Sequence, residues 1–428
     1  MTDIKAKSSS VYYGWWIVAG GFFIAMYISG FIFFSITALL EPINAEFKWG
    51  YAQVSLAASI RGLESSIMAP FIGVLVDRFG PRKLIVLGVV CIGLGLLLLS
   101  RVNSLAVFYL AFIIIAIGGS ACIGVVPITT VGNWFRRRFT LATGILVSGT
   151  AMGGLLIPVA TRLIDTYDWR MAVTIVGLGA WVLLLPLAFI FRHKPEQFGY
   201  QPDGMAAEVD DVAYKRIEDV KERQVSAREA LGTRAFWHMT IAFMCHIAAM
   251  QAIITHIMPF LGSIGIARST ASFMAMAIPV ISVTGRLGFG WLGDNYEKKR
   301  VATAGLVIVL ISMVMLAVTG QDLIWLIFPA LVLAGIGYGG PIPMLPALMR
   351  EHFGRFKLGT LLGVALGVAN IGGILTPPLT GLIYDRLHSY QLAWIIMGGV
   401  ILIGIISMMT IPAARKTWYG RPPNRTPR

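Results

Sequence analysis

Apolar runs long enough to cross a lipid bilayer recur along almost the whole chain. A spanning helix needs about 20 mainly apolar residues, and in the hydrocarbon core only helices and closed barrels satisfy every backbone polar group. Twelve segments meet this length, at approximately residues 15–40, 54–76, 84–99, 105–131, 141–164, 171–191, 236–261, 269–293, 301–318, 323–349, 361–383 and 392–411. The sequence therefore predicts an all-α integral membrane protein with twelve transmembrane helices.

The charges agree with this prediction and give it an orientation. Only 13% of the 428 residues are charged, against about 25% in soluble domains. If the N-terminus is placed in the cytoplasm, 27 of the 35 Lys and Arg residues fall on that side and six on the other. This imbalance follows the positive-inside rule and predicts that both termini are cytoplasmic. The net charge of +14 then needs no nucleic-acid partner.

The cysteines and the first apolar run exclude two other features. Cys91, Cys122 and Cys245 all lie in apolar segments, so we expect no disulfide framework. The run at 15–40 is too long for a signal-peptide core, and we interpret it as the first span.

One long polar stretch divides the spans into six and six. We expect a six-helix bundle at 1–192, a cytoplasmic linker at 193–233, a second six-helix bundle at 234–414 and a cytoplasmic tail at 415–428. Within the linker, Ser226 and Glu229 are spaced as a capping box and predict a short helix.

The two halves repeat each other. The segment from Gly73 to Lys83 follows the second span, and Gly290 to Arg300 follows the eighth at an offset of 217; Gly153 to Pro158 matches Gly372 to Pro377 at an offset of 219. Parallel six-helix repeats place a substrate between the halves near the membrane midplane.

These motifs give the chain a resemblance to the major facilitator superfamily of secondary transporters over nearly its full length. The match is to that superfamily's loop motif at Gly73, Asp77, Arg78, Gly80, Arg82 and Lys83. Residues 13–16 and Arg286 resemble the monocarboxylate transporters and the bacterial oxalate–formate antiporters. The resemblance implies a monomeric carrier of the plasma membrane, here a bacterial inner membrane, without enzymatic activity or a cofactor.

Arg286 is the main candidate for binding a substrate. It lies about 12 Å from Asp294 along a helix, which is close to the midplane, and its planar fork suits a carboxylate. Ser282, one turn earlier, can add a hydroxyl; in the monocarboxylate transporters an acid usually stands there. The alternative is an arginine bonded to carbonyls at a helix crossing. The eleventh span offers no second cation, only Asn370, which favours one carboxylate over two.

Other polar residues inside spans are candidates for proton transfer or for further substrate contacts. His256 and His246 titrate near neutral pH, and Glu64 is a membrane carboxylate that could instead be neutralised by Arg61. No spacing indicates a metal site. Tyr27, Tyr338 and Asn370 could bond a substrate or a neighbouring helix.

The repeated loop motif is expected to latch the halves together. Asp77 can pair with Arg78, Arg82 and Lys83 or with a helix N-terminus, and Asp294 with Arg300 should form a weaker copy, because Asn295 replaces the first arginine.

Together the sequence predicts a secondary transporter of small monocarboxylates, of the lactate, pyruvate or formate type, working by proton symport and alternating access. The partners are a carboxylate anion, a proton and the lipid bilayer. The alternatives are an organic anion exchanger of the oxalate–formate type and an exporter of another small solute.

Overall fold

The architecture comes from a computed structural model, in which the described residues are 12–35, 39, 42–43, 46–49, 51–204, 226–319 and 323–412. The first half contains α1 (Tyr13–Ile28), the π-helical η1 (Ser29–Phe34), α3 (Tyr51–Phe79), α4 (Pro81–Ser100), α5 (Leu105–Cys122), α6 (Val125–Trp134), α7 (Phe139–Met152), the 3₁₀ turn η2 (Gly153–Leu156), α8 (Ile157–Tyr167) and α9 (Trp169–Ile190). The predicted tail at 415–428 and most of the linker lie outside the described residues.

The second half repeats this order. Its elements are α11 (Ala227–Leu231), α12 (Arg234–Ser263), α13 (Arg268–Asn295), α14 (Lys298–Val318), the 3₁₀ turn η5 (Ile324–Leu326), α15 (Ile327–Gly339), α16 (Met344–Phe353), α17 (Leu358–Leu387) and α18 (Gln391–Met409). The short linker helix is confirmed at α11, where the Ser226 hydroxyl accepts a hydrogen bond from the Glu229 backbone N–H at 3.1 Å.

Three crossings are interrupted helices. The α5–α6 crossing breaks at Gly124, whose φ of +81° favours glycine. The α7–α8 crossing passes through η2 just before Pro158, and the α15–α16 crossing breaks at a turn holding Pro341 and Pro343.

The predicted membrane fold of twelve helices in two bundles is confirmed. Among the described residues, eleven helical segments are long and apolar enough to cross a membrane. Helix α3 runs for 29 residues beside α5 and α17 and makes the twelfth crossing. Its sequence contains Glu64, Asp77 and Arg78, which lower its hydropathy.

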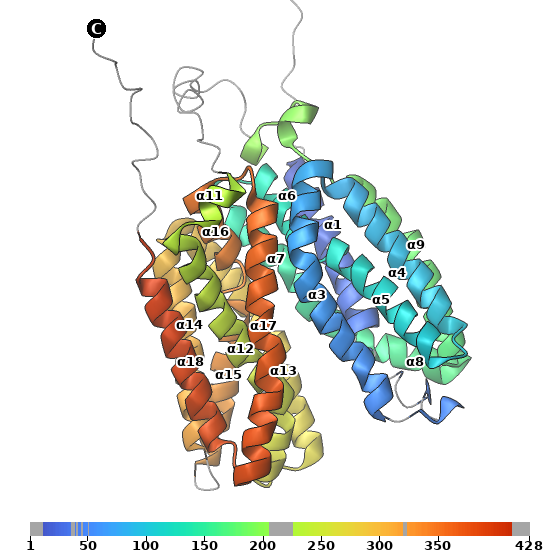
Figure 1. Ribbon diagram of the computed structural model, residues 1–428, viewed down its shortest axis with the longest axis vertical. Helices are drawn as coiled ribbons and strands as arrows, with labels where there is room; N and C mark the ends of the chain where they lie inside the picture. Colours follow the sequence, from blue (N-terminus) through green and yellow to red (C-terminus); the bar gives the residue numbers. More distant parts are fainter. Residues whose placement is uncertain are drawn as a thin grey trace, which may run out of the picture.

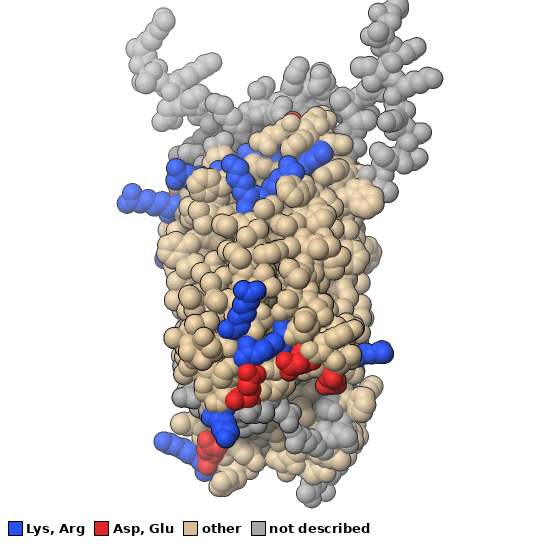
Figure 2. Space-filling view, turned by 90° about the vertical axis from the view of Figure 1, so that its right-hand side faces the viewer, with Lys and Arg blue, Asp and Glu red and all other residues tan. Residues whose placement is uncertain are grey.

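The two bundles lie close together at one end and separate toward the other (Figure 1). We call the first the linker end; it carries residue 12, the described linker residues and residue 412. The far end carries the connections at 46–49, 100–104, 264–267 and 388–390. On the face of the first half, Lys and Arg gather near the linker end above a band with little charge (Figure 2).

Two helix pairs hold the halves together, and glycine makes both possible. In the α3–α17 crossing a methyl group on Gly73 would collide with the carbonyl oxygen of Gly359. In the α7–α13 crossing a methyl group on Gly144 would collide with the carbonyl oxygen of Arg286. The backbones therefore approach more closely than any other residue would allow.

Candidate functional site

Each crossing is closed at the linker end by an aspartate that caps a helix of the opposite half. Asp77 on α3 accepts hydrogen bonds from the Thr360 backbone N–H at 2.9 Å and hydroxyl at 2.6 Å. Asp294 on α13 accepts from the backbone N–H groups of Thr140 at 2.8 Å and Leu141 at 2.9 Å. These donors belong to the first turns of α17 and α7, where unpaired N–H groups and the helix dipole favour a carboxylate.

The cations of the motif do not make the expected pairs with these aspartates. Arg78 lies over the ring of Phe79, and Arg82 lies 4.8 Å from the ring centre of Phe189. Arg300 pairs with Glu297 at 2.7 Å instead of Asp294. The helix N-termini supply the donors instead, which is the other partner expected for these carboxylates, and each aspartate accepts two hydrogen bonds.

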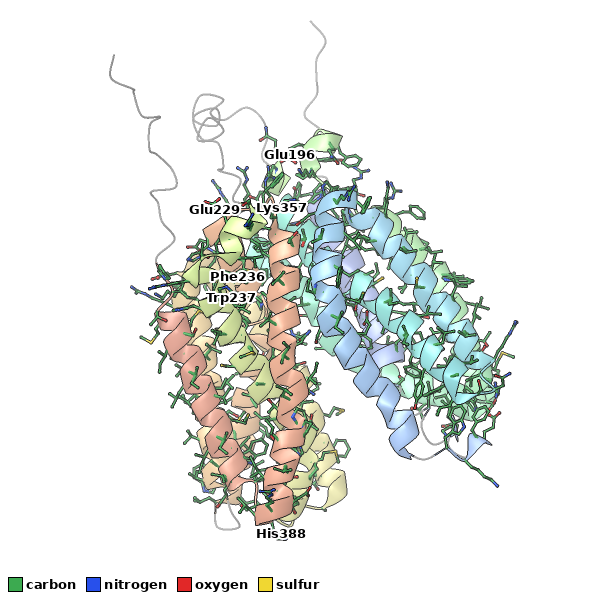
Figure 3. The ribbon with its side chains drawn as sticks, viewed as in Figure 1. Glu196, Glu229, Phe236, Trp237, Lys357 and His388 are labelled. Carbon is green, nitrogen blue, oxygen red and sulfur yellow. The ribbon has the colours of Figure 1, made fainter. Side chains whose placement is uncertain are left out.

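Two further contacts at the linker end connect the second half to the linker and to the first half, and no sequence pattern predicted them. Arg355, in the turn before α17, forms an ion pair of 2.8 Å with Glu196 of the linker. Arg350 of α16 donates from Nη1 to the carbonyl of Phe135, at the end of α6. Figure 3 labels Glu196 and Lys357 at this end and His388 at the opposite one.

Arg286 lies where the α7–α13 crossing ends toward the middle of the molecule. Its side chain is 2% exposed, and Nη1 donates to the Val147 carbonyl at 2.5 Å and to the Thr150 hydroxyl at 2.8 Å. The guanidinium carbon lies 5.6 Å from the ring centre of Tyr338, and Nε is buried with no partner. This is the alternative that the sequence left open, an arginine bonded to a carbonyl at a helix crossing.

A cavity of about 490 Å³ opens between the halves beyond the α3–α17 crossing. Its lining residues are Phe33, Glu64, Ala69, Ala116, Gly119, Ser120, Ile123, Gly124, Val125, Ile247, Gln251, Leu366, Asn370, Gly373 and Ile374. Glu64 accepts from the Ser120 hydroxyl at 3.1 Å. Of the predicted residues, Glu64 and Asn370 therefore line the cavity, whereas Arg286 does not.

Three predicted residues are bonded inside their own half, away from that lining. The Tyr27 hydroxyl donates to the Val176 carbonyl at 2.7 Å. The Ser282 hydroxyl donates to the carbonyl of Pro279 on its own helix at 2.6 Å. His246 Nε2 lies 2.8 Å from the Gly337 carbonyl. These hydrogen bonds connect neighbouring helices or stay within one helix, and none of the three residues lines the cavity.

His256 lies near the far end of the second half. Its Nε2 is 2.9 Å from the Pro377 carbonyl and its Nδ1 is 3.4 Å from the Tyr390 hydroxyl. The ring is half-buried among residues of its own half and does not line the cavity.

Sequence reasoning missed Ser120, Thr150 and Thr360. In apolar helices a hydroxyl usually bonds its own backbone, as Thr130 bonds the Val126 carbonyl, so the sequence does not indicate which hydroxyls also bond a residue of another helix. The partner across a helix crossing depends on packing that periodicity does not encode.

Comparison with known proteins places the chain among transporters. The profile of the Major Facilitator Superfamily matches residues 21–287 and 257–426. The chain is 24% identical over 399 residues to monocarboxylate transporter 12 of Xenopus laevis, covering 90% of this chain and 86% of that one. It is 26% identical over 396 residues to the uncharacterized MFS-type transporter YcxA of Bacillus subtilis, covering 88% and 90%. The structure resembles the crystal structure of the E. coli fucose:proton symporter FucP, with a TM-score of 0.70, 16% identity and coverage of 94% and 100%.

Proposed function

Since the chain belongs to the major facilitator superfamily of transporters, we propose that it carries small monocarboxylates, of the lactate, pyruvate or formate type, together with a proton. Relatives named monocarboxylate transporter 12 support this substrate class. The placement of Arg286 supports it independently, and the proposal depends on that residue.

The carrying observation is a buried cation whose partners are all neutral. Arg286 contacts a carbonyl, a hydroxyl and an aromatic ring, and no carboxylate of the described side chains pairs with it. A buried charge without a counter-ion is disfavoured in a membrane. The carbonyl and the hydroxyl belong to the opposite half, so these bonds break when the halves move apart there. A carboxylate then completes the site.

The charge distribution supports the orientation. With most Lys and Arg at the linker end, the positive-inside rule places that end in the cytoplasm, and we propose a bacterial inner membrane. The bundles then separate toward the outside, and the cavity is the outward-facing half of an alternating-access cycle. The helix caps by Asp77 and Asp294 latch the closed cytoplasmic end.

Within this cycle the residues divide into two roles. Arg286, with Tyr338 beside it, holds the carboxylate, and Asn370 supplies a polar contact from the cavity wall. Glu64 takes the proton, because among the proposed proton carriers it alone lines the cavity; His256 is the second candidate. Proton and anion together allow the loaded site to cross the midplane without net added charge.

Uptake by purified protein in proteoliposomes tests the assignment. We expect Arg286→Gln to lose pH-driven uptake of radiolabelled lactate, pyruvate and formate, by at least about 100-fold, since it loses a charged hydrogen-bond pair. Arg300→Gln is the matched control, because Arg300 is exposed and pairs with Glu297. Wild-type uptake by Arg286→Gln would overturn the carboxylate assignment.

A second candidate function follows from the cavity itself. Its described lining holds the carboxylate of Glu64, together with the amides of Gln251 and Asn370, and no Lys or Arg. Such a lining favours a proton-coupled carrier of a neutral polar or cationic solute. In a panel of labelled solutes, uptake of such compounds with none of carboxylates would favour this alternative.

A further inference from the structure

The oxygens that hold Arg286 form a compact acceptor site on the other half. Thr150 donates its hydroxyl hydrogen to the Val147 carbonyl at 2.7 Å, and both oxygens accept from the same guanidinium nitrogen. They lie in the last turns of α7, before the chain continues as the 3₁₀ turn η2 at Gly153. We call this pair the α7 acceptor site.

The α7 acceptor site satisfies the guanidinium incompletely. Its two oxygens are neutral, and they engage Nη1, whereas Nε remains buried without a partner. A buried donor without an acceptor costs free energy. A carboxylate can bond two nitrogens of a guanidinium at once and adds the opposite charge. A carboxylate can therefore bind the Arg286 guanidinium better than the α7 acceptor site does.

We infer that the α7 acceptor site competes with the transported carboxylate for Arg286. The contact between Arg286 and the α7 acceptor site, which we call the clasp, and the binding of an anion then exclude each other. This inference rests on the proposed function. In the empty carrier the clasp holds the far end open. An anion that takes the guanidinium removes the cross-half contact of Arg286 and leaves the crossing held by Asp294 and by backbone packing. Thr150 is then a positioning residue, not a substrate contact.

The neutral partners of Arg286 also determine which ligands can release the clasp. Release of the clasp requires a negative charge on a planar two-oxygen group, because a neutral ligand would only replace one set of neutral acceptors with another. Lactate and pyruvate should release it, whereas the neutral amide of lactate should not.

Double electron–electron resonance between the far ends tests this directly. Nitroxide labels would be placed at the exposed positions 101 and 386 after replacement of Cys91, Cys122 and Cys245 by alanine. Thr150→Val keeps the shape of the side chain and removes its hydroxyl. Thr161→Val is the matched control, because the Thr161 hydroxyl bonds only the Ile157 carbonyl of its own segment.

In empty protein we expect Thr150→Val to lower the ratio of far-end-open to far-end-closed molecules by about tenfold, while Thr161→Val stays at the wild-type ratio. Lactate should lower the wild-type ratio, its amide should leave it unchanged, and lactate should have a smaller effect on Thr150→Val.

The empty-protein measurement separates the two hypotheses. An unchanged ratio in Thr150→Val overturns the clasp even if lactate is transported. A lowered ratio with no response of the wild type to any carboxylate supports the clasp and defeats the carboxylate as its competitor. A response to the amide equal to that to lactate also defeats the competition.

Discussion

The two crossings between the halves share a frame and differ in how they end. The α3–α17 crossing begins at Asp77 and gives way to the cavity near Glu64, which accepts a hydrogen bond from Ser120 of its own half. The α7–α13 crossing begins at Asp294 and ends at Arg286, which is bonded to the opposite half. The α3–α17 crossing thus ends at Glu64, which already lines the cavity. The α7–α13 crossing ends at Arg286, whose bonds to the opposite half must break before it can bind a solute.

Under the proposed function, this difference gives separate tasks to the two sides of the carrier. A proton can reach Glu64 in the open cavity with no movement of the halves. An anion reaches Arg286 only by displacing protein groups, so its arrival is coupled to the contact between the halves. Glycines bring the helix backbones together in both crossings. The side chain at the end of each crossing, Glu64 or Arg286, then determines whether that end is bonded to the opposite half.

The largest expected effect on transport would come from replacing the carboxylate of Glu64, which lines the cavity. We expect Glu64→Gln to abolish acid-driven accumulation of lactate in proteoliposomes, to the level seen without a pH gradient, since its amide cannot take up the proton. Exchange of internal for external lactate should persist, because Arg286 is untouched. Glu46→Gln, a surface carboxylate, is the control. Full accumulation by Glu64→Gln would move the proton to another group, with His256 the next to test.

A smaller effect is expected at the shared beginning of the two crossings. Asp77→Asn and Asp294→Asn should each weaken the linker-end latch by about 1–2 kcal/mol, because each replaces one accepting oxygen of a charged cap by a donor. Far-end distances between nitroxide labels at positions 101 and 386 would report the shift toward the far-end-closed state.

The comparison requires the two aspartate variants to shift that equilibrium by similar amounts, since each carboxylate holds two hydrogen bonds. Asp165→Asn, at an exposed position, should change nothing. A shift confined to Asp77→Asn would mean that the Asp294 latch is weaker than the Asp77 latch, and it would contradict the symmetry of the two.

The sequence repeat made the twelve spans and two bundles predictable, whereas the contacts across the halves depend on how the helices pack. Twelve spans and two bundles followed from apolar runs and from matching motifs at a nearly constant offset, because the period and length of such runs are fixed by the bilayer. The sequence could also place Asp77 and Asp294 at helix ends. It could not tell that Thr360 and Thr140 would receive them, because those partners are 283 and 154 residues away.

The candidate site was predicted less completely for a similar reason. Composition marked Arg286 and Glu64 because a charge in an apolar run is unusual. It could not tell which way either side chain faces; in the structure Glu64 lines the cavity and Arg286 bonds α7. Tyr27 and Ser282 looked equally suitable on sequence alone, since a hydroxyl that ties helices together and one that meets a solute have the same spacing.

The smallest effect concerns a contact inside one half, which should alter stability without changing which end is open. At the far end, Glu46 accepts from Arg170 at 2.6 Å and from the Trp169 indole at 2.8 Å. The hydrogen bond from Arg170 lowers the pKa of Glu46 below its usual value. Because the pKa of Glu46 is lower in the folded than in the unfolded protein, the contact stabilises the fold fully at pH values above the unfolded pKa. That stabilisation is lost as the pH falls through the folded pKa. Because both partners are partly exposed, the contribution should be at most about 1 kcal/mol.

Chemical denaturation of wild type and Glu46→Gln in detergent should therefore show wild type as the more stable protein at about pH 7. The difference should shrink toward zero as the pH falls through the lowered pKa of Glu46 in the folded protein, where the carboxylate binds its proton. The distances between labels at positions 101 and 386 should be the same in both proteins, because no bond across the halves has changed. A shift in those distances would mean that contacts within the first half also set the open state, and the division of tasks between the two crossings would then be incomplete.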